Sequence, residues 1–372
     1  MQLKIALLGG DGIGPEVTAQ AVKSLKAVAE TFGHDFDYRR PPIGAVAIER
    51  TGNPLPEKTI KVCEASDAIL FGAIGTPEFD NDPMAKVRPE QGLLNLRKVL
   101  GLYTNIRPVK AFASMVRKSP LKRDTVSGTD FVIYRELTGG IYFGEKKLSD
   151  DGSLATDLCT YSEAEISRIA HKAFKAAKNR KKKLTLVDKA NVLETSRLWR
   201  RVVTQIAESY PEVTLECMYI DNAVVQIMLS PRQFDVILTD NMFGDILSDQ
   251  GSVIIGSVGL LPSASIGNSN AMFEPIHGSY PEAKDKNMAN PVASILSTAL
   301  LFQHFGLQDE SNAVVAAVLK SFQKNIVTPD IMGSSKYGTD YVGDFIADNI
   351  VDSEQHLNIN DENIGLGKST II

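Results

Sequence analysis

Two aspartates four residues apart, Asp245 and Asp249, are the first indication of chemistry in this 372-residue sequence. On a helix this spacing places both carboxylates on one face, a single turn apart. Two bare carboxylates repel each other there, and a hard cation such as Mg²⁺ or Mn²⁺ removes the repulsion while still accepting substrate oxygens. An acidic helix start favoured by the helix dipole is the alternative interpretation. Asp240, which ends the preceding apolar run, is expected to cap the helix rather than to bind metal.

Three arginines, Arg97, Arg107 and Arg135, are the natural counterpart of such a cation site. A guanidinium fork binds a carboxylate through two parallel hydrogen bonds, which a lysine cannot do. Taken singly, each could be an ordinary surface arginine. However, Arg107 ends a short apolar stretch and Arg135 adjoins the apolar run 132–134, where a bare surface charge is unexpected. A cation with several arginines predicts a small substrate that carries more than one carboxylate.

Two further side chains could move protons. Tyr142 lies in the glycine-rich segment 138–144, where glycines allow the backbone to approach a ligand or another strand closely. It is either a core aromatic residue or a proton donor in a cleft. Lys189 follows the apolar run 184–187. Catalytic groups of α/β proteins often lie at strand ends, and a desolvated lysine can act as a base.

The elements that must position these residues form an α/β pattern. Four short apolar runs predict strands buried on both faces: 3–8, 67–72, 184–187 and 234–239. Longer stretches with helical periodicity separate or follow them: 15–32, 162–179, 195–209, 222–230, 291–305 and 310–326. A chain of this length is expected to form two domains. The polar tail from about Ser353 is expected to be poorly ordered.

Composition excludes several classes of protein. A net charge of -5 gives no electrostatic reason to expect nucleic acid or an anionic membrane as a partner. No apolar stretch approaches the roughly 20 residues of a membrane helix, and the N-terminus lacks the apolar core of a signal peptide. The three cysteines are far apart and form no CxxC pair, so neither a disulfide framework nor a zinc site is expected. These features favour a cytoplasmic enzyme.

The glycine-rich turn 9–14 superficially resembles a dinucleotide-binding fingerprint. Its sequence, GGDGIG, does not match G-x-G-x-x-G, and no acidic residue follows a second strand at the expected distance. We therefore reject a Rossmann fold. The sequence also contains no G-x-S-x-G motif, so a serine–histidine hydrolase has no support.

Taken together, the motifs resemble the β-decarboxylating dehydrogenase family, which comprises isopropylmalate, isocitrate, homoisocitrate and tartrate dehydrogenases. The matching blocks run in family order over most of the chain: GGDGIGPEV (9–17), LLNLRK (93–98), RELTGGIYFGE (135–145), DKANVLETSRLWR (188–200), NMFGDILSD (241–249), GSVGLLPSASIG (256–267) and EPIHGSYPEAKDKNMANP (274–291). Several such long blocks make a chance match very improbable.

The resemblance implies a fold that composition could not indicate. It would be a two-domain α/β fold, like those of the isopropylmalate and isocitrate dehydrogenases, built on a continuous mixed sheet that is not a Rossmann fold. A cofactor-binding domain would comprise 1–103 plus 256–372. A domain for substrate, metal and dimerisation would comprise 104–255, with an arm near 140–160 that pairs across a homodimer.

The resemblance also implies the roles of individual residues. Asp245 and Asp249 would bind Mg²⁺ or Mn²⁺ together with Asp221, which would also contact the substrate. Asp221 and Lys189 resemble residues that reach into the partner subunit's site, so that active sites would be shared between subunits. Lys189 would take the proton of the C2 hydroxyl as hydride leaves for the nicotinamide. Tyr142 would protonate the enolate that remains when CO₂ departs.

The residues just before Arg97 indicate which substrate to expect. The three arginines would hold the two carboxylates of a malate moiety, and Glu90 would also line the substrate site. Related isocitrate enzymes have serine and asparagine here for an extra carboxylate, whereas this chain has Leu93 and Leu94. A third carboxylate would be desolvated and unpaired against them, so isopropylmalate is the expected substrate. Core leucines are the alternative interpretation.

The cofactor would be held by residues of the glycine-rich turn and of a later loop: Ile13, Glu274, His277, Gly278, Ser279, Glu282 and Asn290. Glu282 stands where NAD-using members have an acidic residue that binds the ribose hydroxyls and repels a 2′-phosphate. NAD is therefore expected. The commoner residue there is aspartate, and Lys284 partly offsets the repulsion.

Two other functions are compatible with the same motifs. One is oxidation of isocitrate, homoisocitrate or tartrate by another member of the family. The other is a regulatory subunit that binds ligand without turning it over. The presence of Tyr142, Lys189 and all three aspartates argues against the second.

Overall fold

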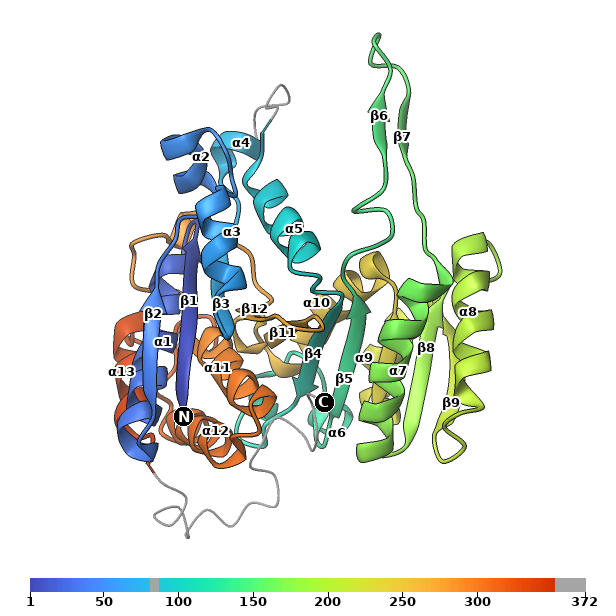
Figure 1. The fold of residues 1–372 in the computed structure, drawn as a ribbon. Coiled ribbons are helices and arrows are strands. Elements are labelled where there is room, and N and C mark those ends of the chain that lie inside the picture. Colours follow the sequence, from blue (N-terminus) through green and yellow to red (C-terminus); the bar gives the residue numbers. More distant parts are fainter. Residues whose placement is uncertain (81–86, 352–372) are drawn as a thin grey trace.

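The computed structural model describes residues 1–80 and 87–351, and within them one large mixed sheet forms the centre of the molecule (Figure 1). Its ten strands are, in sheet order, β2 (Asp35–Arg39), β1 (Gln2–Gly10), β3 (Ala68–Ala73), β12 (Ala271–Pro275), β11 (Pro262–Ile266), β4 (Thr104–Lys110), β5 (Asp130–Glu136), β10 (Val236–Thr239), β8 (Lys183–Asp188) and β9 (Thr214–Tyr219). The tail from about Ser353, predicted to be poorly ordered, lies outside the described residues.

The direction of the strands changes along the sheet. β2, β1, β3 and β12 are parallel, and so are β5, β10, β8 and β9. Between these two groups, β11 and β4 make antiparallel pairs with each other and with their outer neighbours. The expected continuous mixed sheet is therefore confirmed, and its antiparallel centre distinguishes it from a Rossmann sheet.

Helices cover both faces of the sheet. They are α1 (Gly14–Phe32), α2 (Ala45–Thr51), α3 (Glu57–Glu64), α4 (Pro77–Asp80), α5 (Pro89–Val99), α6 (Arg123–Val126), α7 (Glu163–Asn179), α8 (Glu194–Ala207), α9 (Ile220–Leu229), α10 (Asn241–Ile255), α11 (Val292–His304), α12 (Gln308–Gln323) and α13 (Thr339–Asp348). Short 3₁₀ turns are η1 (Val116–Lys118), η2 (Pro231–Gln233), η3 (Val258–Leu260) and η4 (Pro281–Ala283). Each predicted helix is present, with ends shifted by a few residues. No helix among the described residues is both long and apolar enough to cross a membrane.

Helix α7 illustrates why these boundaries fall where they do. Ser162 precedes it, and its hydroxyl accepts a hydrogen bond from the backbone N–H of Glu165. The Glu165 carboxylate accepts one from the Ser162 backbone in return, at 2.7 Å. This reciprocal capping satisfies donors that have no partner within the helix. The apolar positions of α7 then face the sheet, where it packs on β10, β5 and β8.

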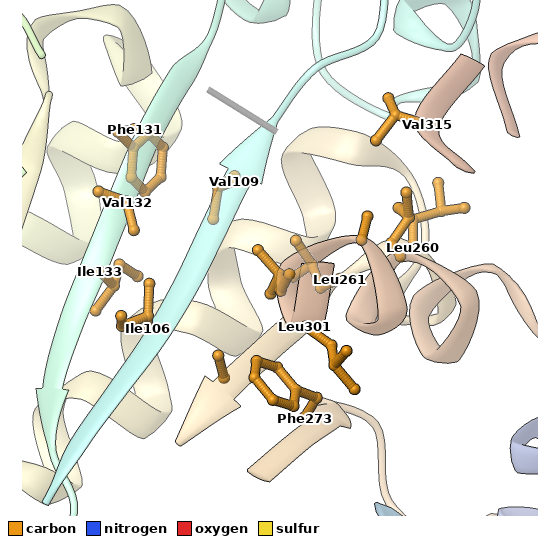
Figure 2. Packing of buried hydrophobic residues seen from close by; sticks show 14 of the residues in the cluster. Ile106, Val109, Phe131, Val132, Ile133, Leu260, Leu261, Phe273, Leu301 and Val315 are labelled. Carbon is orange, nitrogen blue, oxygen red and sulfur yellow. The ribbon is translucent and has the colours of Figure 1, made fainter. Parts of the chain in front are cut away.

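The hydrophobic core lies where the central strands meet the helices. Ile106, Phe131 and Phe273 are almost completely buried, and Figure 2 shows them around the same region as Leu301 of α11. Every residue of β3 and β10 is buried, as expected for strands covered on both faces. The central strands are therefore closely packed against the helices, which limits their movement.

A two-stranded hairpin projects away from this body (Figure 1). Its strands are β6 (Lys146–Leu148) and β7 (Ala155–Asp157), and all of their residues are exposed. Leu148, Leu154 and Leu158 expose more than half of their surface. The hairpin lies within the predicted arm at 140–160, and its pairing across a dimer stays a prediction.

Candidate active site

One face of the central strands carries polar side chains. Asn105 on β4 lies directly opposite Arg135 on β5 and Ser265 on β11, and Arg107 follows Asn105 by two residues. Glu274 on β12 lies opposite Ser263, which is two residues before Ser265. Because side chains alternate between the faces of a strand, all of these groups share one face. The period-two pattern thus gathers two arginines and a glutamate that are far apart in sequence.

Helix α10 packs across this face on β4 and β5. Asp240 caps its N-terminus, since its carboxylate accepts a 2.8 Å hydrogen bond from the backbone N–H of Phe243. The predicted capping role is confirmed. Gly244 allows the close approach, because a Cβ there would lie 2.6 Å from Cγ of Arg135. The Arg135 side chain therefore passes directly beneath the first turns of the helix.

Arg135 and Arg107 converge on Asp245. Nη1 of Arg135 donates to Oδ1 of Asp245 at 2.5 Å, and Nη1 of Arg107 donates to the same oxygen at 3.3 Å. Nε and Nη2 of Arg135 both donate to Oδ1 of Asn241, at 3.1 and 2.8 Å. Asn105 accepts from Nε of Arg107 at 2.6 Å, and Ser248 contacts its Nη1. Both guanidinium groups are thus held in fixed orientations.

The electrostatics of this cluster favour a bound anion. Both arginines are almost completely buried, and burial lowers the pKa of each. Burial raises the pKa of Asp245, but Arg135 and Arg107 outweigh it, so the pKa lies below its usual value. One carboxylate is therefore shared by two buried cations. Asp245 neutralises one of the two guanidinium charges, so one positive charge remains. Because this charge is buried and poorly solvated, it would bind a further carboxylate strongly.

Arg97 extends the cationic cluster from α5. Its Nη2 donates to Oε1 of Glu274 at 3.0 Å, and the Ser265 hydroxyl donates to the same oxygen at 2.9 Å. The Nε atom of Arg97 is buried without a hydrogen-bond partner among the described residues. That N–H is a donor available to a ligand. The structure therefore brings all three predicted arginines together, and it places Glu274, predicted to bind cofactor, against one of them.

Tyr142 lies beside the same carboxylate. Its hydroxyl donates to Oδ2 of Asp245 at 3.2 Å, and the Arg135 guanidinium carbon lies 5.8 Å from its ring centre. Burial, followed by the negative charge of Asp245, raises the pKa of Tyr142, so the phenol stays protonated. Tyr142 also lines an open crevice of about 640 Å³ with Leu94 of α5. Leu93 is half-buried and packs against a small apolar cluster.

Asp249 follows Asp245 on α10 and is exposed. Its carboxylate makes no hydrogen bond or ion pair with the described residues, and its pKa is raised by desolvation and by Asp245. Two oxygen ligands one turn apart, one of them without a partner, fit a divalent cation. Within the described part of a single chain, no three His, Cys, Asp or Glu side chains form a metal site. Asp245 and Asp249 thus form a pair without a third such side chain beside them in this part of the chain.

Lys189 and Asp221 contact each other rather than the arginines. Lys189 Nζ forms an ion pair with Oδ1 of Asp221, which lies in the first turn of α9. The hydrogen bond from Lys189 lowers the pKa of Asp221. The structure thus divides the predicted catalytic residues into two groups within one chain. Tyr142, Asp245 and Asp249 belong to the arginine group, and Lys189 and Asp221 form the other.

The glycine-rich turn after β1 is joined to the predicted cofactor loop. The backbone N–H of Ile13 donates to the carbonyl of Ser279 at 2.8 Å, and Gly12 lies against the same carbonyl. Ile13 also packs with Ala283 of η4. Glu90 at the start of α5 lies beside Gly75, since a Cβ there would be 2.6 Å from its Oε1. Segments from three parts of the chain therefore meet here.

The other predicted cofactor residues differ in their exposure. Gly278 and Glu282 are exposed and accessible to a ligand. The His277 ring contacts the carbonyl of Gly278 at 2.9 Å, its Nε2 is buried without a partner among the described residues, and burial lowers its pKa. Asn290 is buried and bonded within the chain, to Asp330 at 3.0 Å and to the backbone of Val292. Asn290 therefore links the end of the predicted cofactor loop to Asp330 and to the start of α11.

Three residues that orient the arginines were not predicted from the sequence: Asn105, Asn241 and Ser248. A signal was present for two of them. Asn241 precedes Asp245 by four residues, so it shares a helix face with the two aspartates. Asn105 precedes Arg107 by two residues on a strand, which puts it on the same sheet face.

Comparisons with known proteins complete the description of the site. Residues 4–346 match the profile of the isocitrate/isopropylmalate dehydrogenase family. The "3-isopropylmalate dehydrogenase" of Bacteroides fragilis is 53% identical over 352 residues, which is 94% of this chain and 99% of that protein. The protein of the same name from Aquifex aeolicus is 48% identical over 353 residues, 93% and 97% of the two chains. The crystal structure of isocitrate dehydrogenase from Methylococcus capsulatus superposes with a TM-score of 0.85 at 33% identity and covers 93% of this chain and 99% of that one.

Proposed function

The chain belongs to the isocitrate/isopropylmalate dehydrogenase family, and from this membership we propose that it is a 3-isopropylmalate dehydrogenase. The reaction is the oxidative decarboxylation of (2R,3S)-3-isopropylmalate to 4-methyl-2-oxopentanoate and CO₂, with reduction of NAD⁺ to NADH. This is a step of leucine biosynthesis. An enzyme of amino-acid biosynthesis with three free cysteines belongs in the reducing cytoplasm.

The buried arginine cluster is the observation that carries the proposal. Among the residues that the structure describes, Arg97, Arg107 and Arg135 contact only two carboxylates, those of Asp245 and Glu274. A malate moiety brings two more carboxylates, and paired charges in a buried site are far less costly than unpaired ones. Guanidinium forks would also fix the orientation of the substrate, so that C2 faces the cofactor and C3 faces Tyr142.

The chain's own residues would move the protons. Lys189 takes the proton of the C2 hydroxyl while C2 loses its hydride, and the product of this step is a β-keto acid. Cleavage of the bond between C3 and its carboxylate releases CO₂ and leaves an electron pair at C3. Tyr142 gives C3 a proton, and its raised pKa supports this role because the hydroxyl stays protonated. When bound, a divalent cation supplies a Lewis acid at the C2 oxygen, and NAD⁺ supplies the hydride acceptor.

Asp245 and Asp249 would hold Mg²⁺ or Mn²⁺, with Asp221 from a second copy of the chain as the third carboxylate. The lack of a third such side chain beside Asp245 and Asp249 in the described part of one chain supports this sharing. So does the ion pair between Lys189 and Asp221, which keeps these two residues together and lets them enter another subunit's site as a unit. The active enzyme is therefore a homodimer, in which the exposed hairpin β6–β7 joins the two copies.

The specificity for cofactor and substrate comes from a few side chains. Glu282 is exposed on the loop beside Ile13, where it can accept hydrogen bonds from the ribose hydroxyls of NAD and repel a 2′-phosphate. Leu93 and Leu94 offer an apolar surface to the isopropyl group. The cofactor-binding half comprises 1–103 and 256–372, and the substrate half 104–255. The sheet order supports this division, because β4, β5, β8, β9 and β10 adjoin one another.

A steady-state comparison of substrates tests the proposal. Purified protein is assayed with Mg²⁺ or Mn²⁺, with NAD and NADP, and with 3-isopropylmalate, isocitrate, homoisocitrate or tartrate. We expect the highest kcat/KM for 3-isopropylmalate with NAD. Faster turnover of isocitrate, homoisocitrate or tartrate would assign the chain to another activity of the family. Binding of 3-isopropylmalate without any turnover would identify a regulatory subunit.

A further inference from the structure

A second hollow, of about 550 Å³, lies at the carboxyl end of β1, away from the arginine cluster. It is bounded by β1, by one side of α1 and by the segment 40–50, and none of the predicted site residues lines it. Gly9 and Gly10 of β1, Pro15 and Thr18 of α1, and Pro41 and Pro42 are among its lining residues. Ligands of open α/β sheets commonly bind beyond the carboxyl ends of strands.

The charge of this hollow is unusual for the chain. Lys23, Lys26, Arg40 and Arg50 line it, and no aspartate or glutamate does, although the whole chain has a net charge of -5. Lys23 is paired with Asp344. Lys26, Arg40 and Arg50 make no hydrogen bond or ion pair with the described residues. Unpaired cations gathered around a concave surface attract an anion and raise its local concentration.

The walls of the hollow are fixed. The Thr59 hydroxyl donates to the carbonyl of Pro42 at 2.7 Å, which holds the Pro41–Pro42 wall. The buried Asp11 carboxylate accepts from the backbone N–H groups of Ala45 and Gly75, at 2.9 and 3.0 Å. This ties the segment after Pro42 to the end of β3. A preformed hollow binds a ligand without first having to order its own walls.

The rest of the lining is largely apolar. Leu7, Val22, Ile43 and Val46 contribute to it, so the hollow combines an apolar surface with a cationic edge. A phosphate group suits that edge, because it carries nearly two negative charges and three acceptor oxygens, enough for several cations at once. The apolar wall suits a hydrophobic or aromatic body.

We propose that this hollow binds a small organic phosphate, with its phosphate on the Arg40 and Arg50 side and its body against the apolar wall. The hollow shares Gly10, Pro15 and Val46 with a neighbouring hollow that is lined by Gly12, Pro281 and Lys284, next to the predicted cofactor loop. The inference does not depend on the proposed dehydrogenase activity.

Isothermal titration calorimetry with phenyl phosphate tests the inference. The full-length protein is saturated with NAD, so that the probe cannot enter the cofactor site, and is titrated at low ionic strength. We expect one saturable site per chain. The double variant Arg40→Gln/Arg50→Gln should weaken binding by at least about tenfold, because it removes the two guanidinium groups nearest the phosphate.

The matched control is Arg39→Gln/Arg117→Gln, which removes the same charge from exposed arginines that do not line the hollow. It should change the affinity by less than about twofold, because neither arginine lines the hollow and Arg39 is already paired with Asp37. Circular dichroism verifies that both variants are folded. Three results would each overturn the inference: no saturable binding, equal affinity in the wild type and Arg40→Gln/Arg50→Gln, or binding of inorganic phosphate as tight as that of phenyl phosphate.

Discussion

Replacing Asn241 with alanine should weaken the enzyme through Arg135 rather than through any direct contact with substrate. Oδ1 of Asn241 accepts two hydrogen bonds from the Arg135 guanidinium, and its amide donates to the carbonyl of Gly139 at 3.0 Å. Asn241 therefore connects Arg135, which we propose binds substrate, to the glycine-rich segment that carries Tyr142. The residue is 1% exposed, so no water readily replaces its oxygen.

The size of the effect follows from these bonds. A hydrogen bond to a charged group contributes roughly 1.5–3 kcal/mol. If the freed guanidinium recovers one of the two bonds elsewhere, about 2 kcal/mol of transition-state binding is lost. Since about 1.4 kcal/mol corresponds to a factor of ten, kcat/KM for 3-isopropylmalate should fall roughly 30-fold. Most of the change should be in KM for this substrate, with KM for NAD unchanged.

Steady-state formation of NADH measures this split, and thermal unfolding monitors the fold. Asn312→Ala is a matched control, because Asn312 on α12 accepts a 3.0 Å hydrogen bond from a neutral amide, that of Gln308. It should leave both KM values within about twofold of the wild type, as most surface substitutions are nearly neutral. The reasoning fails if Asn241→Ala has normal kcat/KM, or if both KM values rise equally.

Three further predictions address catalysis, stability and cofactor choice. Lys189→Ala should lower kcat by about 10²–10⁴-fold with an unchanged circular dichroism spectrum, because general-base catalysis contributes that much. The control variant Lys178→Ala should leave kcat unchanged. Full activity of Lys189→Ala would remove this lysine from the mechanism. Burial raises the pKa of Asp240 to about 6. Ionisation of this carboxyl is therefore less favourable in the folded state than in the unfolded state. The resulting loss in the free energy of unfolding is absent below pH 4, where the carboxyl is protonated in both states. It is complete above pH 6, where it amounts to about 3 kcal/mol. Asp240→Asn should thus gain stability relative to the wild type as pH rises from 4 to 7 in urea unfolding, and a constant difference across this range would contradict the assignment. Glu282→Ser should raise kcat/KM with NADP relative to NAD by about tenfold, because the repulsion of a 2′-phosphate is removed; an unchanged ratio would show that specificity lies elsewhere.

Much of the fold could be predicted from the sequence, because its buried strands are short apolar runs bounded by helical patterns. β1, β3, β8 and β10 were found this way. β2, β9 and β11 were not, since β2 and β9 lie at the sheet edges with polar or exposed residues, and the sequence of β11, PSASI, contains small residues without a strong apolar signal. The mixed character of the sheet came only from the family resemblance, and the antiparallel pairs at its centre were not predicted. Pairing direction depends on contacts distant in sequence, which local periodicity does not record.

The site was predicted in its components rather than in its connections. Asp245, Asp249 and the three arginines could be recognised by type and spacing, and the structure brings them together. The sharing of Asp245 between Arg107 and Arg135 could not be predicted, because it requires the register of β4 against β5. The partnership of Glu274 with Arg97 was missed for the same reason, since these residues are separated by 177 positions in the chain.

The order of strands in the sheet has a consequence for synthesis on the ribosome. The strands β4, β5, β8, β9 and β10 come from one uninterrupted stretch, 104–239, and adjoin one another in the sheet. In contrast, β1 and β3 emerge first but are joined to that stretch only through β11 and β12, which follow residue 261. We expect the stretch 104–239 to pair its own strands before β1 and β3 are joined to it, since contiguous segments need close only short loops. Until β11 and β12 arrive, the edge of β3 remains open and is the place where a chaperone would be needed most.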